Sequence, residues 1–402
     1  MRQALPPLRA GHRLQLLEGS RGFFPALVDA IDAAADEVLL ETYIFDFTGS
    51  GADVAYALER AARRGLTVRV VMDGFGTPEV PPAWQQRFDF VGVQWVRFSP
   101  PGVFGLLWPG QWRRLHRKLC VIDGGIGFCG GINILDDFHD PNHGALAAPR
   151  FDFALRVEGP LVRQIRDTMR KQWARIEAMG QLRRAHWGQA LGSLRAARLP
   201  AGPAPRPDAH NARAALLLRD NLRNRAVIER AYLRAIGRAR SEIVIANAYF
   251  VPGRRMRRAL IRAALRGVHV SLLLQGRYEY FMQYYAARPV FGALLRAGVR
   301  IHEYAPSFLH AKVAVIDGRW ATVGSSNLDP LSLLLAREAN VVVEDAGFAH
   351  RLRERLVGAM VREGEPMDPA AFAQRSLWQR AMERVALGVM RVLLMVQGKR
   401  YL

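Results

Sequence analysis

The chain has 402 residues, half of them hydrophobic, and a formal net charge of +21 at pH 7. This composition excludes an intrinsically disordered chain, and the length is sufficient for two domains that each bury a core. The charge favours an anionic partner, either a nucleic acid or the surface of an acidic membrane. The only two cysteines, Cys120 and Cys129, fit no zinc-binding or disulfide pattern, so we expect both to be small buried hydrophobes in adjacent strands.

The predicted elements occur twice along the chain. Residues 37–45 (EVLLETYIF) and 242–250 (EIVIANAYF) read as buried strands that match each other with a one-residue slip. Each is followed by a helical stretch that ends at an Arg-Gly pair and then by an alternating strand, over residues 54–74 and 256–276. The order strand, helix, strand, helix, strand, then a strand pair, predicts in each half an α/β/α sandwich with a mixed sheet.

This duplication predicts two domains of one fold, related by a pseudo-twofold axis as in a fused homodimer. The Pro- and Gly-rich stretch LPAGPAPRPD at 199–208 is the predicted linker. We therefore predict a first domain over 1–198, a second over 209–376, and an amphipathic C-terminal segment over 377–402. If the copies face each other, their equivalent motifs meet at the interface.

Each half also contains one short phrase, RLHRKLCVID at 114–123 and FLHAKVAVID at 308–317. The chain has four lysines, and two of them, Lys118 and Lys312, occupy the same place in this phrase, whereas arginine supplies nearly all other basic side chains. A compact ammonium and a wide guanidinium fork are not interchangeable in a tight phosphate site. Because residues two apart in a strand point the same way, the His and Lys of each phrase should project from one face.

A hairpin completes each phrase. The strand ends at an Asp-Gly turn signal, and a returning strand leads to a Gly-rich corner, GGIN at 130–133 and GSSN at 324–327. The corner Asn follows the motif His by 17 residues in both halves, so the hairpin should bring it beside the His-Lys pair. The candidate site residues in these hairpins are His116, Lys118, Asp123, Asn133, His310, Lys312, Asp317, Ser325 and Asn327.

These residue types suit phosphodiester exchange. The reaction needs a nucleophile that is also a good leaving group near neutral pH, and an acid for the departing alkoxide; histidine can do either. Two facing histidines would divide this work, while the motif lysines and corner asparagines would bind the non-bridging phosphate oxygens. The sequence offers no carboxylate cluster that would demand a metal ion, so we expect no metal and no other cofactor.

The doubled pattern His-x-Lys-x4-Asp-x6-Gly-[Gly/Ser]-x-Asn resembles the phospholipase D superfamily, whose members carry a duplicated HKD motif. The resemblance covers nearly the whole chain and extends to ANAYFVPG at 246–253 and VGSSNLDPLSLLLAREANVVV at 323–343. Within the superfamily the chain is similar to cardiolipin synthases, in particular to the shorter bacterial type B, which lacks N-terminal membrane spans. The resemblance implies that His116 is the nucleophile and His310 the acid and then the base; the symmetry of the sequence does not decide between them.

Two carboxylates are candidates to orient the imidazoles. Asp152 and Glu338 are predicted on strands that follow the two corners, where each would contact the second ring nitrogen of a histidine. Asp123 and Asp317 belong to the motif, but we expect them to fix the turn and its hydrogen bonds more than to take part in catalysis.

Three features favour a lipid substrate. They are the apolar and aromatic loop PPGVFGLLWPGQW at 100–112, the Arg-rich helix over 253–267, and the apolar, basic C-terminus. We therefore expect transfer of a phosphatidyl group between two molecules of phosphatidylglycerol, by a peripheral protein on the cytoplasmic face of a bacterial membrane. No run reaches the roughly 20 apolar residues of a membrane span. The C-terminal segment would lie in the headgroup plane or pack on the protein's own core.

Two other functions remain open at this level. A phosphodiesterase or nuclease of the same superfamily would use the positive charge to hold a polyanion, although no platform of interleaved aromatic residues indicates a nucleic-acid partner. A non-catalytic membrane-binding protein with a decayed site is disfavoured because both motifs are intact. The oligomeric state is left open by the sequence.

Overall fold

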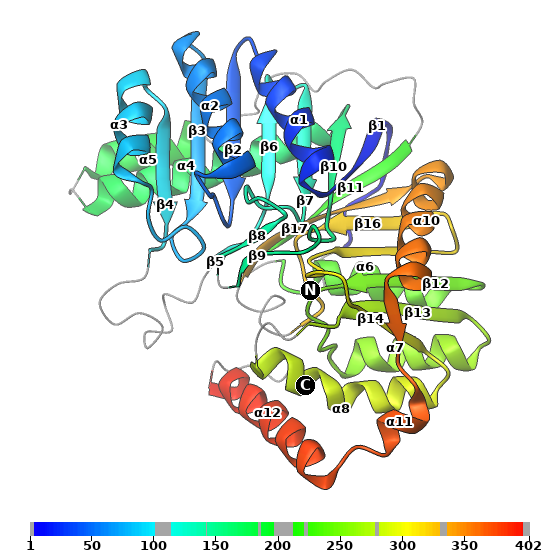
Figure 1. Cartoon of the computed structure of the whole chain (residues 1–402). Helices are drawn as coiled ribbons and strands as arrows, with labels where there is room; N and C mark the ends of the chain where they lie inside the picture. The colour runs from blue at the N-terminus through cyan, green and yellow to red at the C-terminus, as the bar shows by residue number, and fades with distance from the viewer. Residues whose placement is uncertain are drawn as a thin grey trace. The chain divides into compact units, whose positions relative to one another are not determined.

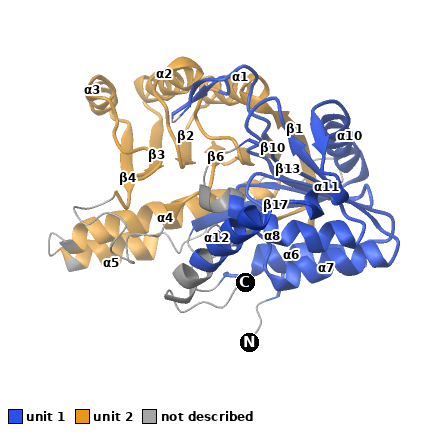
Figure 2. Ribbon diagram, turned by 60° about the horizontal axis from the view of Figure 1, so that its bottom comes forward, with its two compact units in different colours: residues 1–6, 137–153, 217–402 blue, residues 7–136, 154–216 orange. Residues whose placement is uncertain are grey.

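The structure is a computed structural model that describes residues 4–100, 114–141, 143–183, 186–196, 212–220, 224–277, 281–329 and 336–396. The predicted linker at 199–208 and nearly all of the predicted apolar loop at 100–112 lie outside these residues. The chain divides into two compact units (Figure 2): residues 7–136 and 154–216 form unit 2, and residues 1–6, 137–153 and 217–402 form unit 1. The short segment 137–153 therefore belongs to the unit that contains the second half of the chain.

Unit 2 contains most of the elements of the first half (Figure 1). They are β1 (Arg9–Glu18), α1 (Gly19–Asp32), β2 (Glu37–Thr42), α2 (Gly49–Arg63), β3 (Thr67–Asp73), α3 (Pro82–Val91), β4 (Gln94–Phe98), β5 (Arg114–Leu115), β6 (Leu119–Ile122), β7 (Ile126–Gly130), β10 (Phe153–Glu158), α4 (Leu161–Arg183), α5 (Trp187–Ala196) and most of β11 (Ala212–Arg219).

The sheet of unit 2 is mixed, as the sequence predicts. Its strands follow the order β11-β1-β10-β7-β6-β2-β3-β4. The pairs β2–β3 and β3–β4 are parallel, and β2–β6, β6–β7 and β7–β10 are antiparallel. Helices α1 and α2 cover one face, and α4 crosses the other face behind β2, β6 and β7 (Figure 1). This layering places the hairpin β6–β7 in the middle of the sheet.

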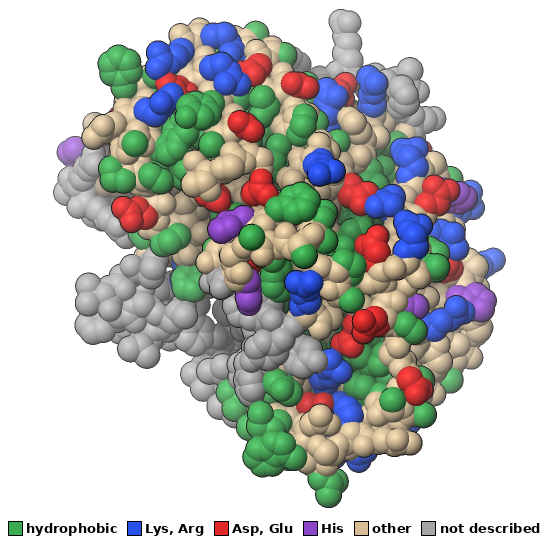
Figure 3. Space-filling view, in the orientation of Figure 1, with side chains coloured by type: hydrophobic (Ala, Val, Ile, Leu, Met, Phe, Trp, Pro, Cys, Tyr) green, Lys and Arg blue, Asp and Glu red, His purple; other side chains and the backbone are tan. Residues whose placement is uncertain are grey.

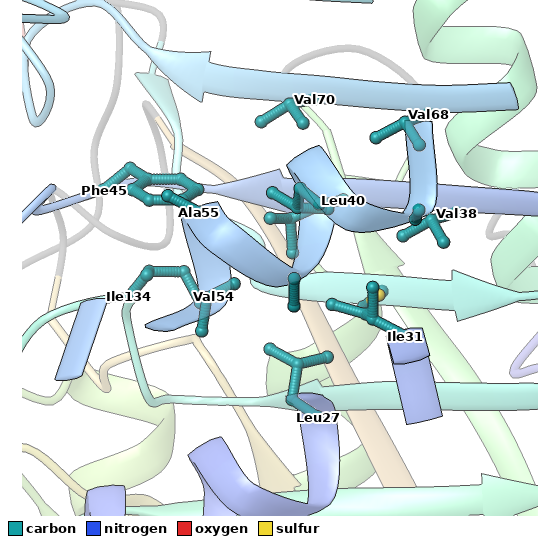
Figure 4. Packing of buried hydrophobic residues seen from close by; sticks show 14 of the residues in the cluster. Leu27, Ile31, Val38, Leu40, Phe45, Val54, Ala55, Val68, Val70 and Ile134 are labelled. Atoms are coloured by element: carbon teal, nitrogen blue, oxygen red, sulfur yellow. The ribbon is translucent and has the colours of Figure 1, made fainter. Parts of the chain in front are cut away.

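The core of unit 2 lies between α1, α2 and the sheet (Figure 4). Leu27 and Ile31 of α1 and Val54 of α2 are fully buried against aliphatic side chains such as Val38 and Val70 of the central strands. Each such side chain contributes about 1.5–3 kcal/mol when it leaves water. This packing holds the strands that carry the first motif.

Unit 1 repeats the arrangement with the second half of the chain. Its elements are β8 (His139–Asp140), β9 (Gly144–Ala145), α6 (Val227–Arg238), β12 (Glu242–Asn247), α7 (Arg254–Leu265), β13 (His269–Gln275), α8 (Phe281–Arg296), β14 (Arg300–Tyr304), β15 (Lys312–Ile316), β16 (Trp320–Gly324), β17 (Ala336–Glu344), α10 (Ala346–Arg362), β18 (Gly364–Pro366), α11 (Pro369–Ala373) and α12 (Leu377–Val396).

The sheet of unit 1 has the order β18-β14-β13-β12-β15-β16-β17. As in unit 2, two parallel pairs, β12–β13 and β13–β14, adjoin an antiparallel hairpin, β15–β16. Helix α10 packs on β12, β14, β15, β16 and β17, and α7 packs on β13. The order β12, α7, β13, α8, β14, β15, β16 is the predicted sequence of elements.

The register of the two halves corrects one detail of the predicted repeat. The main-chain N–H of Glu37 and that of Glu242 bind the motif aspartate in their own halves. Eight residues further on, Phe45 and Phe250 each form a bridge to the residue that follows the corner asparagine. The strands over 37–45 and 242–250 are thus equivalent without any slip, and the predicted one-residue slip is wrong.

The C-terminal helices form a small group at the edge of unit 1. Helix α12 packs along α8, and α11 contacts α8 as well, and Figures 1 and 2 both show α8 and α12 side by side. One side of α12 is therefore covered by protein, while Trp378 and Val385 on another side are exposed. In the part of the chain that the structure describes, no helix has the length and hydropathy that crossing a membrane requires.

Candidate active site

Both motif hairpins turn at their Asp-Gly pair in the same unusual backbone conformation. Asp123 and Asp317 have φ angles of 50° and 51°, and the glycines that follow have φ angles of 63° and 60°. Glycine adopts this left-handed region without strain, whereas aspartate tolerates it because its side chain can bind nearby main-chain groups. The predicted turn is therefore present in both halves with matching geometry.

The two motif aspartates bind main-chain N–H groups rather than the motif histidines in the described contacts. Asp123 accepts from Ala35, Asp36 and Glu37, at 2.8, 2.8 and 2.9 Å. Asp317 accepts from the N–H groups of Arg240, Ser241 and Glu242, and also from the Ser241 hydroxyl. Burial acts to raise the pKa of Asp317, but these hydrogen bonds outweigh it and leave the pKa below its ordinary value. Each carboxylate joins its hairpin to the loop before β2 or β12.

The first motif lies just before a strand rather than within one. His116, Arg117 and Lys118 fall between β5 and β6, so the predicted strand begins only at Leu119. Lys118 is 5% exposed, and its ammonium donates to the main-chain oxygen of His116 at 2.8 Å. The side chains of His116 and Lys118 both contact Tyr43, whose ring centroid lies 4.7 Å from that of His116 and 5.3 Å from the Lys118 nitrogen. This tyrosine was not among the predicted site residues.

Arg117, which stands between His116 and Lys118 in the sequence, forms a buried ion pair. The guanidinium of Arg117 is 2.7 Å from a carboxylate oxygen of Glu41 on β2, and the two side chains are 8% and 1% exposed. Since an unpaired charge at this depth is strongly unfavourable, each of the two charges requires the other. The equivalent positions in unit 1 are Ala311 and Ala246, both fully buried. The ion pair is thus present in the first half alone, so a comparison of the two repeats in the sequence does not point to it.

The second motif contains a histidine paired with a carboxylate. The Nδ1 atom of His310 lies 2.6 Å from Oδ2 of Asp152, and the aspartate is nearly fully buried. Main-chain bonds fix this contact: the N–H of Phe151 donates to the Phe308 oxygen at 3.0 Å, and the N–H of His310 donates to the Phe151 oxygen at 3.0 Å. The segment 137–153 therefore supplies the partner of the second histidine. Asp152 itself precedes β10 by one residue, rather than lying on the predicted strand.

The lysine of the second motif is more deeply buried than that of the first. Lys312 begins β15, has no exposed surface, and donates to the main-chain oxygen of His310. An ammonium at this depth is stabilised by hydrogen bonds and by a negatively charged neighbour. A phosphate oxygen would be such a neighbour.

The corner asparagines occupy matching places in the two units. Oδ1 of Asn133 accepts from the N–H of Ile44 at 3.2 Å, and Oδ1 of Asn327 accepts from the N–H of Tyr249 at 3.3 Å. A carboxamide held by its oxygen presents its NH₂ group as the donor. The corner is also close-packed, because a Cβ atom at Gly324 would lie 2.3 Å from the Asn340 side chain.

The remaining predicted residues, Ser325 and Glu338, contact each other. The Ser325 hydroxyl donates to Oε2 of Glu338 at 2.5 Å and accepts from the N–H of Ala339 at 3.1 Å. Both side chains have no exposed surface, and Glu338 lies on β17 as predicted. The contact with Ser325 fixes one oxygen of the carboxylate. The predicted contact of Glu338 with a motif histidine stays a prediction.

The motif residues are thus brought together as two half-sites, one in each unit. His116, Lys118, Asp123 and Asn133 lie in unit 2, whereas His310, Lys312, Asp317, Asn327 and Asp152 lie in unit 1. That the two imidazoles act on one phosphorus atom stays a prediction. Over the described ranges, no group of three or more His, Cys, Asp or Glu side chains is placed to hold a metal ion.

The two cysteines have the buried positions that the sequence predicts. Cys120 of β6 and Cys129 of β7 are reduced and 1% exposed, on adjacent strands. Burial raises the pKa of the Cys129 thiol to about 12, and it raises that of Cys120 as well. Neither thiol is therefore a nucleophile near neutral pH.

A known protein family matches both halves of the chain. A family profile described as "Cardiolipin synthase, PLD-like domain" matches residues 27–148 and again residues 232–358. Each match contains one of the two motifs. The prediction of two copies of one phospholipase D-like α/β fold is therefore confirmed.

Whole-chain relatives extend this likeness. "Cardiolipin synthase B" of Escherichia coli strain K12 is 37% identical over 371 residues, which cover 92% of this chain and 86% of the relative. "Cardiolipin synthase" of Geobacillus thermodenitrificans is 29% identical over 94% of this chain and 72% of its own length. Among solved structures, a phosphatidylserine synthase of Haemophilus influenzae superposes over 98% of this chain and 97% of its own, with a TM-score of 0.69. At 11% identity, that last likeness concerns the fold alone.

Proposed function

Because the chain belongs to the phospholipase D-like family of cardiolipin synthases, we propose that it is a phosphatidyltransferase that converts two molecules of phosphatidylglycerol into cardiolipin and glycerol. The observation that carries this proposal is the pair formed by His310 and the buried Asp152, beside the buried ammonium of Lys312. An imidazole oriented by a carboxylate can hold and release a proton, and an ammonium beside it can bind a phosphate.

In the first step, Nε2 of His116 attacks the phosphorus of the donor lipid. A phosphorus–nitrogen bond forms while the bond from phosphorus to the glycerol headgroup oxygen breaks. His310 gives its proton to that oxygen, so that glycerol leaves as a neutral alcohol. Asp152 supports this role, since a carboxylate 2.6 Å from Nδ1 stabilises the imidazolium that must be present at the start of the step.

In the second step, the headgroup of another phosphatidylglycerol is the acceptor. His310, now neutral, removes the proton from one of its hydroxyl groups, and the oxygen attacks phosphorus as the phosphorus–nitrogen bond breaks. Cardiolipin is released, and both histidines return to their initial protonation states. Lys118, Lys312 and the NH₂ groups of Asn133 and Asn327 would bind the non-bridging oxygens throughout, where negative charge increases in the transition state.

The same proposal assigns the protein to the surface of a bacterial membrane. Phospholipid substrates require contact with a bilayer, and the net charge of +21 favours one that contains anionic lipids. We propose peripheral association at the cytoplasmic face. The exposed apolar side chains of α12 and the basic residues of α7 support this association. Phosphatidylglycerol would then be substrate and docking surface together.

The activity is tested with purified full-length protein and vesicles that contain phosphatidylglycerol, with the lipid products separated and identified by mass spectrometry. Cardiolipin and glycerol should appear in equal amounts. Phosphatidic acid without cardiolipin would show a hydrolase, the alternative within the superfamily, and would overturn the transferase proposal. Cleavage of DNA or RNA without lipid turnover would show a nuclease.

The roles of the two histidines are tested with variants. His116→Ala should form neither product nor covalent adduct. His310→Ala lacks the acid of the first step and the base of the second, so its turnover should be slow, and the phosphatidyl-histidine adduct that it forms should be on the peptide that contains His116. His186→Ala, which alters an exposed histidine outside both motifs, is the matched control and should retain full activity. An adduct on His310 would reverse the two roles without affecting the proposed reaction.

A further inference from the structure

A cavity at the edge of unit 1 contains none of the motif residues. It lies among α8, α11 and α12, is partly open to solvent, has a volume of about 440 Å³, and is lined in part by Pro289, Leu295 and Phe372. This volume is within the range of about 300–1,000 Å³ that is usual for small-molecule sites. We refer to it as the arginine pocket, because its charged lining consists of Arg296, Arg375, Arg380, Arg384 and a single acid, Glu383.

The charge of the arginine pocket is strongly unbalanced. Glu383 is 4% exposed and already forms an ion pair with Arg375, whose guanidinium also stacks on the ring of Phe372. The pair leaves the guanidinium groups of Arg296, Arg380 and Arg384 to determine the net charge of the lining. Burial, together with the nearby positive charges of Arg288 and Arg380, lowers the pKa of Arg375 in spite of Glu383. An anion entering the pocket would therefore be attracted electrostatically.

Helix α12 presents a second, apolar surface beside these arginines. Trp378, Ala381, Val385 and Val389 are exposed, and their spacing of three and four residues places them on one side of the helix. Arg380 and Arg384 lie on the side between this apolar face and the buried face that contains Glu383 and Leu387. In Figure 3, green side chains gather at the lower edge of the view, where Figure 1 shows α12.

We propose that the arginine pocket is a second lipid site, which binds the phosphate of an anionic phospholipid between Arg296 of α8 and Arg380 and Arg384 of α12, while the acyl chains contact the exposed apolar face of α12. The inference does not depend on catalysis by the two motifs. It assigns to α8 and α12 a function in lipid binding that is separate from the motif hairpins.

The apolar face distinguishes a lipid phosphate from a free anion. Inorganic phosphate would use only the guanidinium groups, and it would leave Trp378, Val385 and Val389 exposed to water. A phospholipid uses both surfaces at once, since a helix in the headgroup plane buries its apolar side among acyl chains and keeps its arginines at the level of the phosphates. The exposed indole of Trp378 suits that interfacial position as well.

The test measures binding of a short-chain, monomeric phosphatidylglycerol by calorimetry, in the His116→Ala background so that no turnover occurs. Two binding events are expected, one at the motifs and one at the arginine pocket. The double variant Arg296→Gln/Arg384→Gln should weaken one event by about ten- to hundredfold, because two charge-assisted contacts to phosphate are lost. Both side chains are exposed, so folding should be unaffected.

The matched control is Arg175→Gln/Arg195→Gln, which removes two exposed arginines from α4 and α5 and changes the net charge equally. It should leave both binding events intact. If the two double variants weaken binding to the same extent, the effect is one of net charge only and the proposal is overturned. The same holds if the pocket variant retains both events.

Two further arms identify the ligand. Inorganic phosphate at millimolar concentration should not displace the lipid from the pocket; full displacement would show a site for free anions and overturn the lipid assignment. Trp378→Ser/Val385→Ser, which alters only exposed side chains, should weaken sedimentation with phosphatidylglycerol vesicles at least threefold. Unchanged sedimentation would show that the apolar face of α12 does not contact acyl chains. The outcome of these arms is independent of whether the protein makes cardiolipin.

Discussion

At the scale of single residues, the side chains of the motif aspartates are each held by several main-chain hydrogen bonds. Asp317 accepts hydrogen bonds from three consecutive main-chain N–H groups, and Asp123 does the same in the other unit. A carboxylate at this position connects the turn of the hairpin to the start of β12 or β2. Replacing this carboxylate should therefore change the free energy of unfolding of the protein.

We predict that Asp317→Asn lowers the free energy of unfolding by about 1–3 kcal/mol at pH 7, because a neutral amide accepts these bonds less strongly. The pKa of Asp317 is lowered in the folded state, so its contribution is present above the unfolded pKa, near 3.8, and is lost as pH falls through the folded value. The difference between wild type and variant should therefore shrink as pH falls past 3.8 and vanish only below the folded pKa of Asp317. Urea unfolding from pH 7 to pH 3 measures it.

The control for this prediction is Asp29→Asn, at an exposed position on α1. It should change stability little at any pH. A deficit of Asp317→Asn that persists undiminished at pH 3 would show that shape rather than charge is what the turn requires.

The buried motif lysines lead to a second prediction at this scale. Lys312 has no exposed surface, so the longer and planar guanidinium of arginine would displace its neighbours. We expect Lys312→Arg to lower kcat by at least about a hundredfold, the effect typical of losing one preorganised donor to a transition-state oxyanion. Lys171→Arg, at an exposed position on α4, should leave the activity unchanged. Wild-type activity in Lys312→Arg would show that any cation suffices there.

At the scale of elements, the two halves differ at the contact between β2 and the segment that precedes β6. The first half contains the buried pair Arg117–Glu41, whereas the second contains Ala311 and Ala246. The two units thus fill equivalent positions of the same fold with two different interactions. One is an ion pair that must remain complete, and the other is a small apolar contact.

This difference predicts a specific pattern of stabilities. Arg117→Ala should lower the free energy of unfolding by about 3–5 kcal/mol, because it leaves the carboxylate of Glu41 buried and unpaired. The double variant Arg117→Ala/Glu41→Ala, which reproduces the residues of the second half, should be more stable than Arg117→Ala alone. Urea unfolding of the three proteins tests this, and a double variant less stable than the single one would contradict it.

The elements also show what the sequence could and could not predict. Strand and helix order, both hairpins and the Asp-Gly turns followed from residue patterns, because hydrophobic period and turn chemistry are local. Tyr43, Arg117 and Glu41 were missed, since they occur in one half only and their roles depend on contacts between distant segments. The predicted slip was wrong because the register is imposed by the hydrogen bonds of Asp123 and Asp317, which join segments that are distant in the sequence.

At the scale of the whole molecule, charge is the dominant property. With a net charge of +21, binding to vesicles of phosphatidylglycerol should weaken steeply as salt rises, because the screening length falls from about 10 Å at 0.1 M to about 3 Å at 1 M. Sedimentation across this range measures the effect. Residual binding at high salt should be abolished by Trp378→Ser/Val385→Ser. Binding that does not respond to salt would show that apolar contact alone holds the protein on the membrane.

The path of residues 137–153 has a consequence for how the protein is made. The ribosome completes Asp152 some 158 residues before His310, so the second half-site receives its carboxylate from the first half of the gene. A gene cut between the repeats would yield an N-terminal fragment that retains Asp152 and a C-terminal fragment whose histidine lacks this partner. Although the sequence reads as a tandem duplication, the second copy does not encode a complete half-site, because its histidine depends on a carboxylate encoded in the first copy.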